Sequence, residues 1–181
     1  LRKLKKILKK LSKKNWLKAF NKEMVLKSFS KINLFLKVNL KKKNGLHDIQ
    51  SLYCLIDLFD IIKINKIKGN RDKIRIVGPF AKLINKKNNS VNNLLKALRK
   101  FRLISSYYSI TVIKKVPVFS GLGGGTSNAA CILKFLFKNK IRTKLLNKLE
   151  KIIGSDLRLF FKKQGFLKDL KSVVEIKKKQ K

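Results

Sequence analysis

A glycine-rich segment is the part of this sequence whose residue types and spacing most clearly suggest chemistry. Residues 117–130 read PVFSGLGGGTSNAA, with four glycines among five consecutive positions. Glycines let backbone N–H groups converge, and the Thr-Ser-Asn that follows them is typical of the first turn of a helix. Converging amides at a helix N-terminus bind anions, so the segment predicts a phosphate-binding loop. The alternative is that the glycines only allow close packing at a corner between a strand and a helix.

This loop differs from two common nucleotide-binding motifs. No Lys-Ser or Lys-Thr pair follows the last glycine, as a Walker A motif requires. The sixth-position glycine of the dinucleotide-binding fingerprint is also missing. The loop therefore predicts phosphate binding without indicating either of these two folds.

The net charge offers a competing function. The 181 residues include 47 Lys+Arg and 9 Asp+Glu, a formal net charge of +38. Such a charge is typical of nucleic-acid-binding proteins, because Lys and Arg neutralise phosphates and release counterions. However, only seven of the cations are Arg, the residue that base recognition favours, and the lysines are spread through nearly every segment. We therefore predict a solvated basic surface and no specific nucleic-acid partner.

The cysteines and the hydropathy restrict the class of protein further. Cys54 and Cys131 lie among apolar neighbours without a metal-type spacing to the single histidine, so we predict free, buried thiols. No stretch approaches the ~20 apolar residues of a membrane span. We expect a cytoplasmic protein without a membrane partner, either a monomer or a weak homodimer.

Hydrophobic periodicity predicts an α+β fold. Residues 32–40 alternate apolar and polar side chains, and Asn44-Gly45 predicts a tight turn that returns the chain through 49–64 as an antiparallel hairpin. Strands and helices do not alternate regularly, which favours a mixed sheet packed with helices over a parallel doubly wound sheet. The other predicted elements are short strands at 74–76 and 108–112, a helix after Asn88-Asn89-Ser90, a helix after the glycine loop, and a helix at 143–153 ending at Gly154.

The first 23 residues form a basic segment with apolar residues at helical spacing. A membrane-surface helix and a targeting sequence are two interpretations of that pattern. The segment uses Lys where transit peptides use Arg, and the first methionine is Met24, next to the strand pattern. We therefore expect residues 1–23 to be a basic extension that could arise from translation upstream of the natural start.

The glycine loop resembles the second motif of the GHMP small-molecule kinases, Pro-x-x-x-Gly-Leu-Gly-Gly-Gly-Ser/Thr-Ser-Asn-Ala-Ala. Within that superfamily the chain resembles the kinases of 4-diphosphocytidyl-2-C-methyl-D-erythritol. The segments that carry this resemblance are 30–36 (SKINLFL), 43–51 (KNGLHDIQS), 55–60 (LIDLFD) and 153–156 (IGSD). The resemblance spans about residues 24–176. It implies a GHMP N-terminal domain with the ribosomal protein S5 domain 2-like fold, acting in the non-mevalonate route to isoprenoids.

The resemblance also implies roles for individual residues. Asp156 corresponds to the catalytic aspartate that accepts the proton of the attacking 2-hydroxyl, and Lys31 to the lysine that offsets charge on the phosphoryl group. Asn33 and His47 match residues near the cytidine-bearing substrate. ATP and Mg²⁺ are the implied cofactors, and Ser127 is a candidate Mg²⁺ contact. The residues implied to bind ATP are Pro117, Gly121, Leu122, Gly123, Gly124, Gly125, Thr126, Ser127 and Asn128, with Asn89 near the adenine.

The sequence departs from the family pattern at three places. Leu46 replaces a tyrosine, which removes an aromatic ring from the substrate side. Arg158 replaces a proline, and it either alters the loop or reaches a phosphate. A basic tail at 177–181 stands where the family continues into a C-terminal domain, so we expect that domain to be absent. The alternatives left open are another GHMP kinase, a catalytically inactive kinase fragment and a basic nucleic-acid-binding module.

Overall fold

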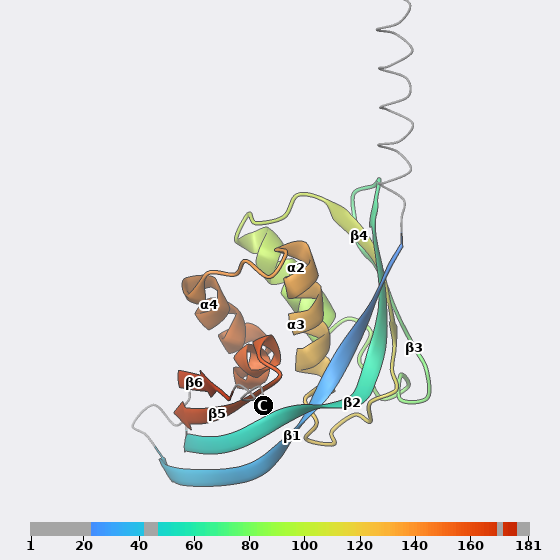
Figure 1. Ribbon diagram of the computed structural model, residues 1–181. Helices are drawn as coiled ribbons and strands as arrows, with labels where there is room; N and C mark the ends of the chain where they lie inside the picture. The colour runs from blue at the N-terminus through green and yellow to red at the C-terminus, as the bar shows by residue number, and fades with distance from the viewer. Residues whose placement is uncertain (1–22, 42–46, 170–171, 177–181) are drawn as a thin grey trace, which may run out of the picture.

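The computed structural model describes residues 23–41, 47–169 and 172–176. It confirms the predicted α+β class: six strands form one mixed sheet, and three α-helices lie together on one side of it (Figure 1). Several sequence-based expectations fall outside the described residues: the extension at 1–22, the Asn44-Gly45 turn with Leu46, the tail at 177–181 and the side chain of His47.

The predicted hairpin is present and longer than expected. Strand β1 (Met24–Lys41) pairs antiparallel with β2 (His47–Ile67), from Met24 opposite Ile64 onward. The strand begins at Met24, well before the predicted alternation at residue 32. The register shifts after Phe29, so β1 bends just before the segment that carries Lys31.

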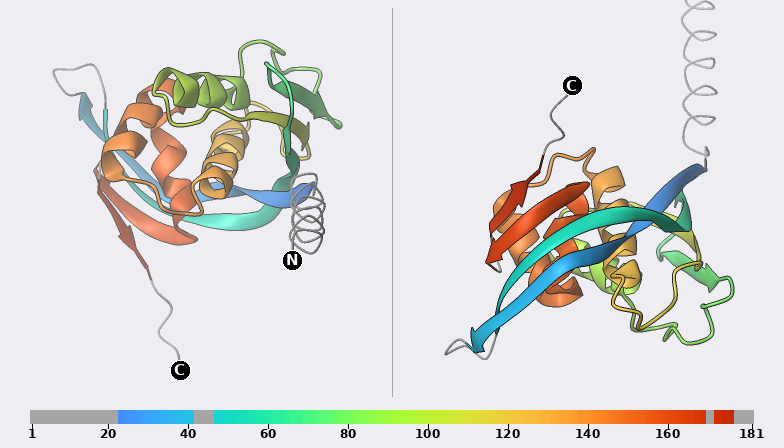
Figure 2. Two further views of the ribbon diagram at one scale, coloured as in Figure 1. Left: turned by 90° about the horizontal axis from the view of Figure 1, so that it is seen from above. Right: turned by 60° about the horizontal axis from the view of Figure 1, so that its bottom comes forward.

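Strand β2 is shared between two parts of the sheet (Figure 2). Its C-terminal third pairs with β4 (Tyr107–Ile113), and its N-terminal third pairs with β5 (Gln164–Asp169). Strand β3 (Lys73–Val77) runs parallel to β4, and β6 (Ser172–Glu175) pairs with β5. Strands β3 and β4 confirm the predicted short strands, whereas β5 and β6 are not predicted from the sequence.

The three α-helices match those expected from the sequence, and a short 3-10 helix follows them. Asn89 caps the first, because its side-chain oxygen accepts a hydrogen bond from the Asn92 N–H at 3.1 Å. Gly154, with φ +139°, ends the third as predicted. The elements are α2 (Ser90–Lys100), α3 (Gly124–Leu136), α4 (Thr143–Ile153) and the 3-10 helix η1 (Ser155–Phe161).

The core lies between these helices and strands β2 and β4, and it holds α3 in place. Burying its aliphatic side chains stabilises the fold by about 1.5–3 kcal/mol for each large one. Its fully buried members include Ile62, Ile64, Leu94, Leu98, Ile110, Ile132, Leu133, Leu149 and Leu157.

Two sequence-based expectations concern the cysteines and the membrane. Cys54 and Cys131 are both free thiols, although each is only partly buried. Desolvation raises the pKa of Cys131 to about 11, so this thiol stays protonated at neutral pH. None of the helices in the described ranges is long and apolar enough to cross a membrane.

Candidate active site

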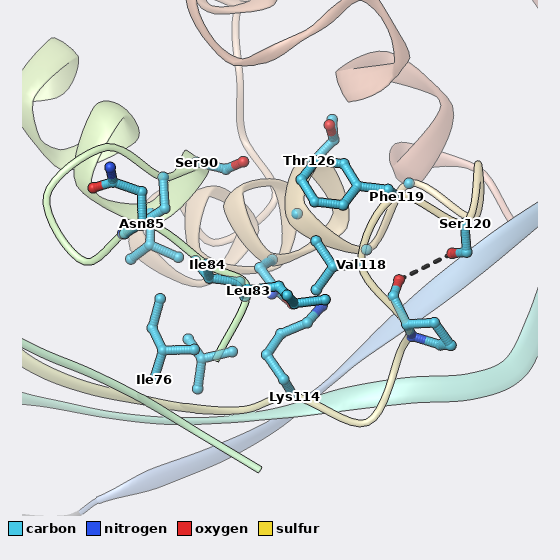
Figure 3. Close-up of a pocket in the computed structure, with 18 of the residues that line it drawn as sticks. Ile76, Leu83, Ile84, Asn85, Ser90, Lys114, Val118, Phe119, Ser120 and Thr126 are labelled. Atoms are coloured by element: carbon cyan, nitrogen blue, oxygen red, sulfur yellow. Dashed lines mark hydrogen bonds between the residues drawn. The ribbon is translucent and has the colours of Figure 1, made fainter. Parts of the chain in front are cut away.

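A cavity of about 450 Å³ opens at the N-terminus of α3 (Figure 3). The glycine loop borders it on one side, and the segment that precedes α2 borders it on the other. Ile76, Val112 and Lys114 close it on the side of the sheet. The first turn of a helix leaves backbone N–H groups without partners inside the helix, so this end of the cavity favours an anion.

The glycines of the loop are required for two different reasons. Gly121 and Gly123 have φ of +75° and +68°, a region that other residues enter at a cost. Gly124 and Gly125 do not have positive φ, but they lie in tight contacts. A Cβ at Gly124 would lie 3.0 Å from Lys114 Nζ, and one at Gly125 would lie 3.0 Å from Ser90 Oγ. The loop therefore depends on glycine for both its shape and its packing.

Lys31 connects the glycine loop to the predicted catalytic aspartate. Its backbone N–H donates to the carbonyl oxygen of Leu122 at 3.0 Å. Its Nζ donates to Asn33 Oδ1 at 3.1 Å and lies 3.3 Å from Asp156 Oδ2. Three of the residues named from the sequence, Lys31, Asn33 and Asp156, thus meet at one point.

The two charged groups of this cluster differ in exposure. The Lys31 side chain is 4% exposed and the Asp156 side chain is 40% exposed. A buried ammonium held in place beside an accessible carboxylate can neutralise phosphate charge while the carboxylate accepts a proton.

Gly123 lies where the loop, β1 and η1 come together. A Cβ at this position would lie 2.7 Å from Cζ of Phe160 and 3.6 Å from Cε of Lys31. Phe160 belongs to η1, the helix that also carries Asp156. The absent side chain of Gly123 therefore allows the lysine, the aspartate and the loop to approach one another.

A buried polar cluster under the loop was not predicted from the sequence. Asp60 Oδ2 accepts hydrogen bonds from Lys114 Nζ at 2.5 Å and from Asn128 Nδ2 at 3.0 Å. Its Oδ1 accepts from the backbone N–H groups of Lys115 at 2.8 Å and Val116 at 2.9 Å. The signal in the sequence was an acid within an otherwise apolar stretch, at the end of the segment 55–60 that carries part of the family resemblance. Within the described residues, Asn128 Oδ1 is buried and has no hydrogen-bond partner.

The hydroxyl of Ser127 is bonded to β1, and the residue does not line the cavity beside α3. It is buried, donates to the carbonyl oxygen of Phe29 at 2.5 Å and lies 2.8 Å from Ser28 Oγ. These bonds attach α3 to β1 and turn the hydroxyl away from the cavity. Thr126 lines the cavity instead, with its Oγ1 3.3 Å from where a Cβ at Gly154 would lie. The Ser127 contact with Mg²⁺ stays a prediction, and Thr126 is a second hydroxyl residue that lines this cavity.

Two other residues named from the sequence have side chains that are bonded within the protein. Asn89 borders the cavity, but its side chain caps α2 and also donates to the Asn85 carbonyl oxygen at 3.0 Å. Arg158 donates to the carboxylate of Glu150 through two nitrogens and to Asn147 Oδ1 at 3.1 Å. Its guanidinium therefore joins η1 to α4, and the expectation that it reaches a phosphate is not supported.

The comparisons with known proteins agree with this geometry. Residues 89–157 match the protein family described as GHMP kinases N terminal domain. A 4-diphosphocytidyl-2-C-methyl-D-erythritol kinase from Pelagibacter ubique is 41% identical over 141 residues, which cover 76% of this chain and 50% of that protein. A protein of the same name from Thermodesulfovibrio yellowstonii is 37% identical, covering 76% of this chain and 47% of that protein. The chain spans about half the length of the curated relatives it matches.

Solved structures share the fold. A crystal structure of 4-(cytidine 5'-diphospho)-2C-methyl-D-erythritol kinase superposes with a TM-score of 0.62 at 21% identity, covering 84% of this chain and 55% of that one. The mevalonate kinase of Methanococcus jannaschii superposes with a TM-score of 0.55 at 18% identity, covering 87% and 57%.

Proposed function

The chain belongs to the GHMP kinases, and from this we propose that it binds ATP in the cavity beside α3 and transfers the γ-phosphoryl group to 4-diphosphocytidyl-2-C-methyl-D-erythritol. The acceptor atom is the 2-hydroxyl oxygen. We assign this activity to a domain at residues 24–176, with residues 1–23 as a basic extension and 177–181 as a basic tail. The relatives' names support the choice of substrate, and the geometry supports the chemistry.

The polar end of the cavity supports a site for the triphosphate. The first turn of α3 offers free N–H groups and the positive end of the helix dipole, which favour phosphate oxygens. The rest of the cavity is lined by apolar side chains, including Ile76, Leu83 and Val112, and suits the base. This arrangement directs the γ-phosphate toward the side on which Gly123 contacts Lys31 and Phe160.

In the transfer itself, the 2-hydroxyl oxygen forms a bond to the γ-phosphorus as the bond from that phosphorus to the β–γ bridging oxygen breaks. ADP leaves, and the hydroxyl proton passes to the carboxylate of Asp156. Lys31 stabilises the negative charge spread over the transferring group. Asn33 accepts a hydrogen bond from the Lys31 ammonium, and we assign Asn33 on β1 and His47 on β2 to the acceptor side of the site.

The donor set is compatible with Mg²⁺ carried by the nucleotide. Mg²⁺ prefers hard oxygen ligands and keeps several waters, so one or two protein oxygens are enough. Thr126 and Asp156 supply such oxygens beside the loop. In the described part of the chain no group of three or more His, Cys, Asp or Glu side chains lies close enough to hold a metal alone. Bound there, Mg²⁺ would neutralise phosphate charge.

The single observation that carries this proposal is the position of Lys31. One buried ammonium contacts Asn33 and Asp156, while the backbone of the same residue holds the glycine loop. A lysine on the basic surface of the protein would have neither the burial nor these three connections.

Calorimetry tests the nucleotide site directly. We expect the 181-residue chain to bind one ATP, with an affinity that Gly124→Val removes, because a branched side chain would collide with Lys114 and Val116. Binding that depends steeply on salt, is equally strong for an unrelated DNA duplex and ignores Gly124→Val would instead identify a general polyanion surface.

A further inference from the structure

Phe119 is a large apolar side chain that the glycine loop holds in solvent. The residue is 91% exposed, the highest value among the exposed large hydrophobic residues of the described part of the chain. The residue nevertheless lines the cavity beside α3. Figure 3 shows the ring directed away from the loop backbone, on the same side as Thr126. Core packing therefore does not explain an aromatic residue at this position.

The backbone conformation of Phe119 is one in which a phenylalanine is uncommon. Its φ is +61°, in the left-handed region that bulky residues rarely adopt and that glycine or asparagine tolerates better. The loop is fixed on both sides of it. Ser120 Oγ donates to the Pro117 carbonyl oxygen at 2.9 Å, and the Leu122 carbonyl oxygen accepts the N–H of Lys31 at 3.0 Å. The shape of the loop favours glycine here, so the ring serves something other than loop geometry.

The wall of the cavity opposite the loop is also apolar and exposed. Leu83, from the segment before α2, is 65% exposed and lines the same cavity. Ile84 adds further apolar surface there, and Val118 adds apolar surface from the loop. The cavity thus has a polar end at the first turn of α3 and an apolar end whose two exposed side chains come from different segments.

We propose that Phe119 stacks on the base of the bound nucleotide and, with Leu83, encloses it between two apolar side chains. The proposal rests on the proposed function, because it takes the cavity to hold ATP. A flat heteroaromatic base matches the face of a phenylalanine ring, and such stacking needs no hydrogen bonds. A bound nucleotide would then offset the free-energy cost of the Phe119 backbone conformation and of its exposed apolar side chain.

Two substitutions separate the ring from the loop geometry. Phe119→Asn removes the ring and keeps a residue that tolerates positive φ, whereas Phe119→Trp keeps an aromatic face. We would measure the affinity of the 181-residue chain for ATP and for inorganic tripolyphosphate by calorimetry, at an ionic strength of about 0.15 M. Base–aromatic stacking predicts that Phe119→Asn weakens ATP binding by about tenfold and leaves tripolyphosphate binding unchanged. Phe119→Trp should keep the parental affinity for ATP.

Other results would overturn the proposal in distinguishable ways. An equal loss for ATP and tripolyphosphate would mean that the ring acts through the shape of the loop. Unchanged ATP affinity in Phe119→Asn, with a parent that binds ATP, would mean that the ring serves a different surface, such as a contact with another polypeptide. A parent that does not bind ATP would contradict the proposed function itself. Thermal unfolding of Phe119→Asn checks the fold, and its Tm should not fall below that of the parent.

Discussion

Asp60 and Lys114 form a buried ion pair directly under the glycine loop. Their side chains are 0% and 3% exposed, and Asp60 Oδ2 lies 2.5 Å from Lys114 Nζ. The same carboxylate accepts the backbone N–H groups of Lys115 and Val116, which lead into the loop. One acid therefore fixes the end of β4, the first residues of the loop and, through Asn128, the first turns of α3.

Asp60→Asn should destabilise the protein by about 3–5 kcal/mol, because it leaves the Lys114 ammonium buried without a counterion. Adding Lys114→Met should recover part of that loss. Urea denaturation measures the free energy of unfolding of both variants. Glu175→Gln, which alters the exposed pair with Lys162, is the control, and it should lower that free energy by less than about 1 kcal/mol. A double variant as unstable as Asp60→Asn alone would show that the pair is not the source of the stability.

Gly121 and Gly123 provide a matched comparison for the loop. Both have positive φ, so an alanine at either position should cost roughly 1–2 kcal/mol in backbone strain. Only Gly123 is crowded: a Cβ there meets the Phe160 ring at 2.7 Å, whereas nothing lies within 4 Å of one at Gly121. We expect Gly123→Ala to weaken ATP binding much more than Gly121→Ala does, as measured by calorimetry. Phe160→Leu in the Gly123→Ala background should restore part of the affinity, and equal losses at both glycines would contradict this account.

Asp156→Asn should lower kcat by at least about 10²-fold while changing the KM for ATP little, because the amide cannot accept the hydroxyl proton. Lys31→Met should impair turnover to a similar extent. The measurement is ADP release with 4-diphosphocytidyl-2-C-methyl-D-erythritol, in a chimera that joins this chain to the C-terminal half of the Pelagibacter ubique relative. Arg158→Gln, which breaks the contact between η1 and α4, is the structural control. Turnover by Asp156→Asn at the parental rate would remove Asp156 from the mechanism.

Tyr53 should make the stability sensitive to alkaline pH. Burial, with a smaller contribution from the charge of Glu175, raises the pKa of Tyr53 to about 12 from its ordinary 10.0. Because the folded state holds the proton more tightly, this contribution is complete below pH 10 and is lost as the pH rises toward 12. The Tyr53 hydroxyl has no hydrogen-bond partner among the described residues, so Tyr53→Phe should not destabilise the protein at pH 7. Urea unfolding across pH 7 to 12 should show a smaller alkaline loss in Tyr53→Phe, and an unchanged loss would contradict this origin.

The local parts of the fold could be predicted from the sequence because their signals are local. Asn89 at the start of α2 and Gly154 at the end of α4 act through the backbone of their own turns. Strands β5 and β6 escaped prediction because they are short, because β5 depends on pairing with β2, more than a hundred residues away in the chain, and because β6 in turn depends on pairing with β5. The alternation from Ile32 to Val38 correctly predicts a strand, yet Leu34, Leu36 and Val38 are exposed, so the pattern does not define a buried face.

Only the residues of the candidate site that belong to sequence motifs could be predicted. The loop, Lys31 and Asp156 could be named because they match a family pattern, and the structure places them together. The orientation of the Ser127 hydroxyl depends on where β1 lies, which no local pattern contains. The Asp60–Lys114 pair needs two residues from different strands to meet, and either residue alone has the appearance of ordinary surface charge.

The sharing of β2 between β4 and β5 has a consequence for the order of events during synthesis. The β1–β2 hairpin can form as soon as both strands have left the ribosome, because its contacts are local. The other edge of its N-terminal third stays unpaired until Gln164–Asp169 has been made. An open strand edge can pair with another nascent chain, so the polypeptide is prone to aggregate during this interval.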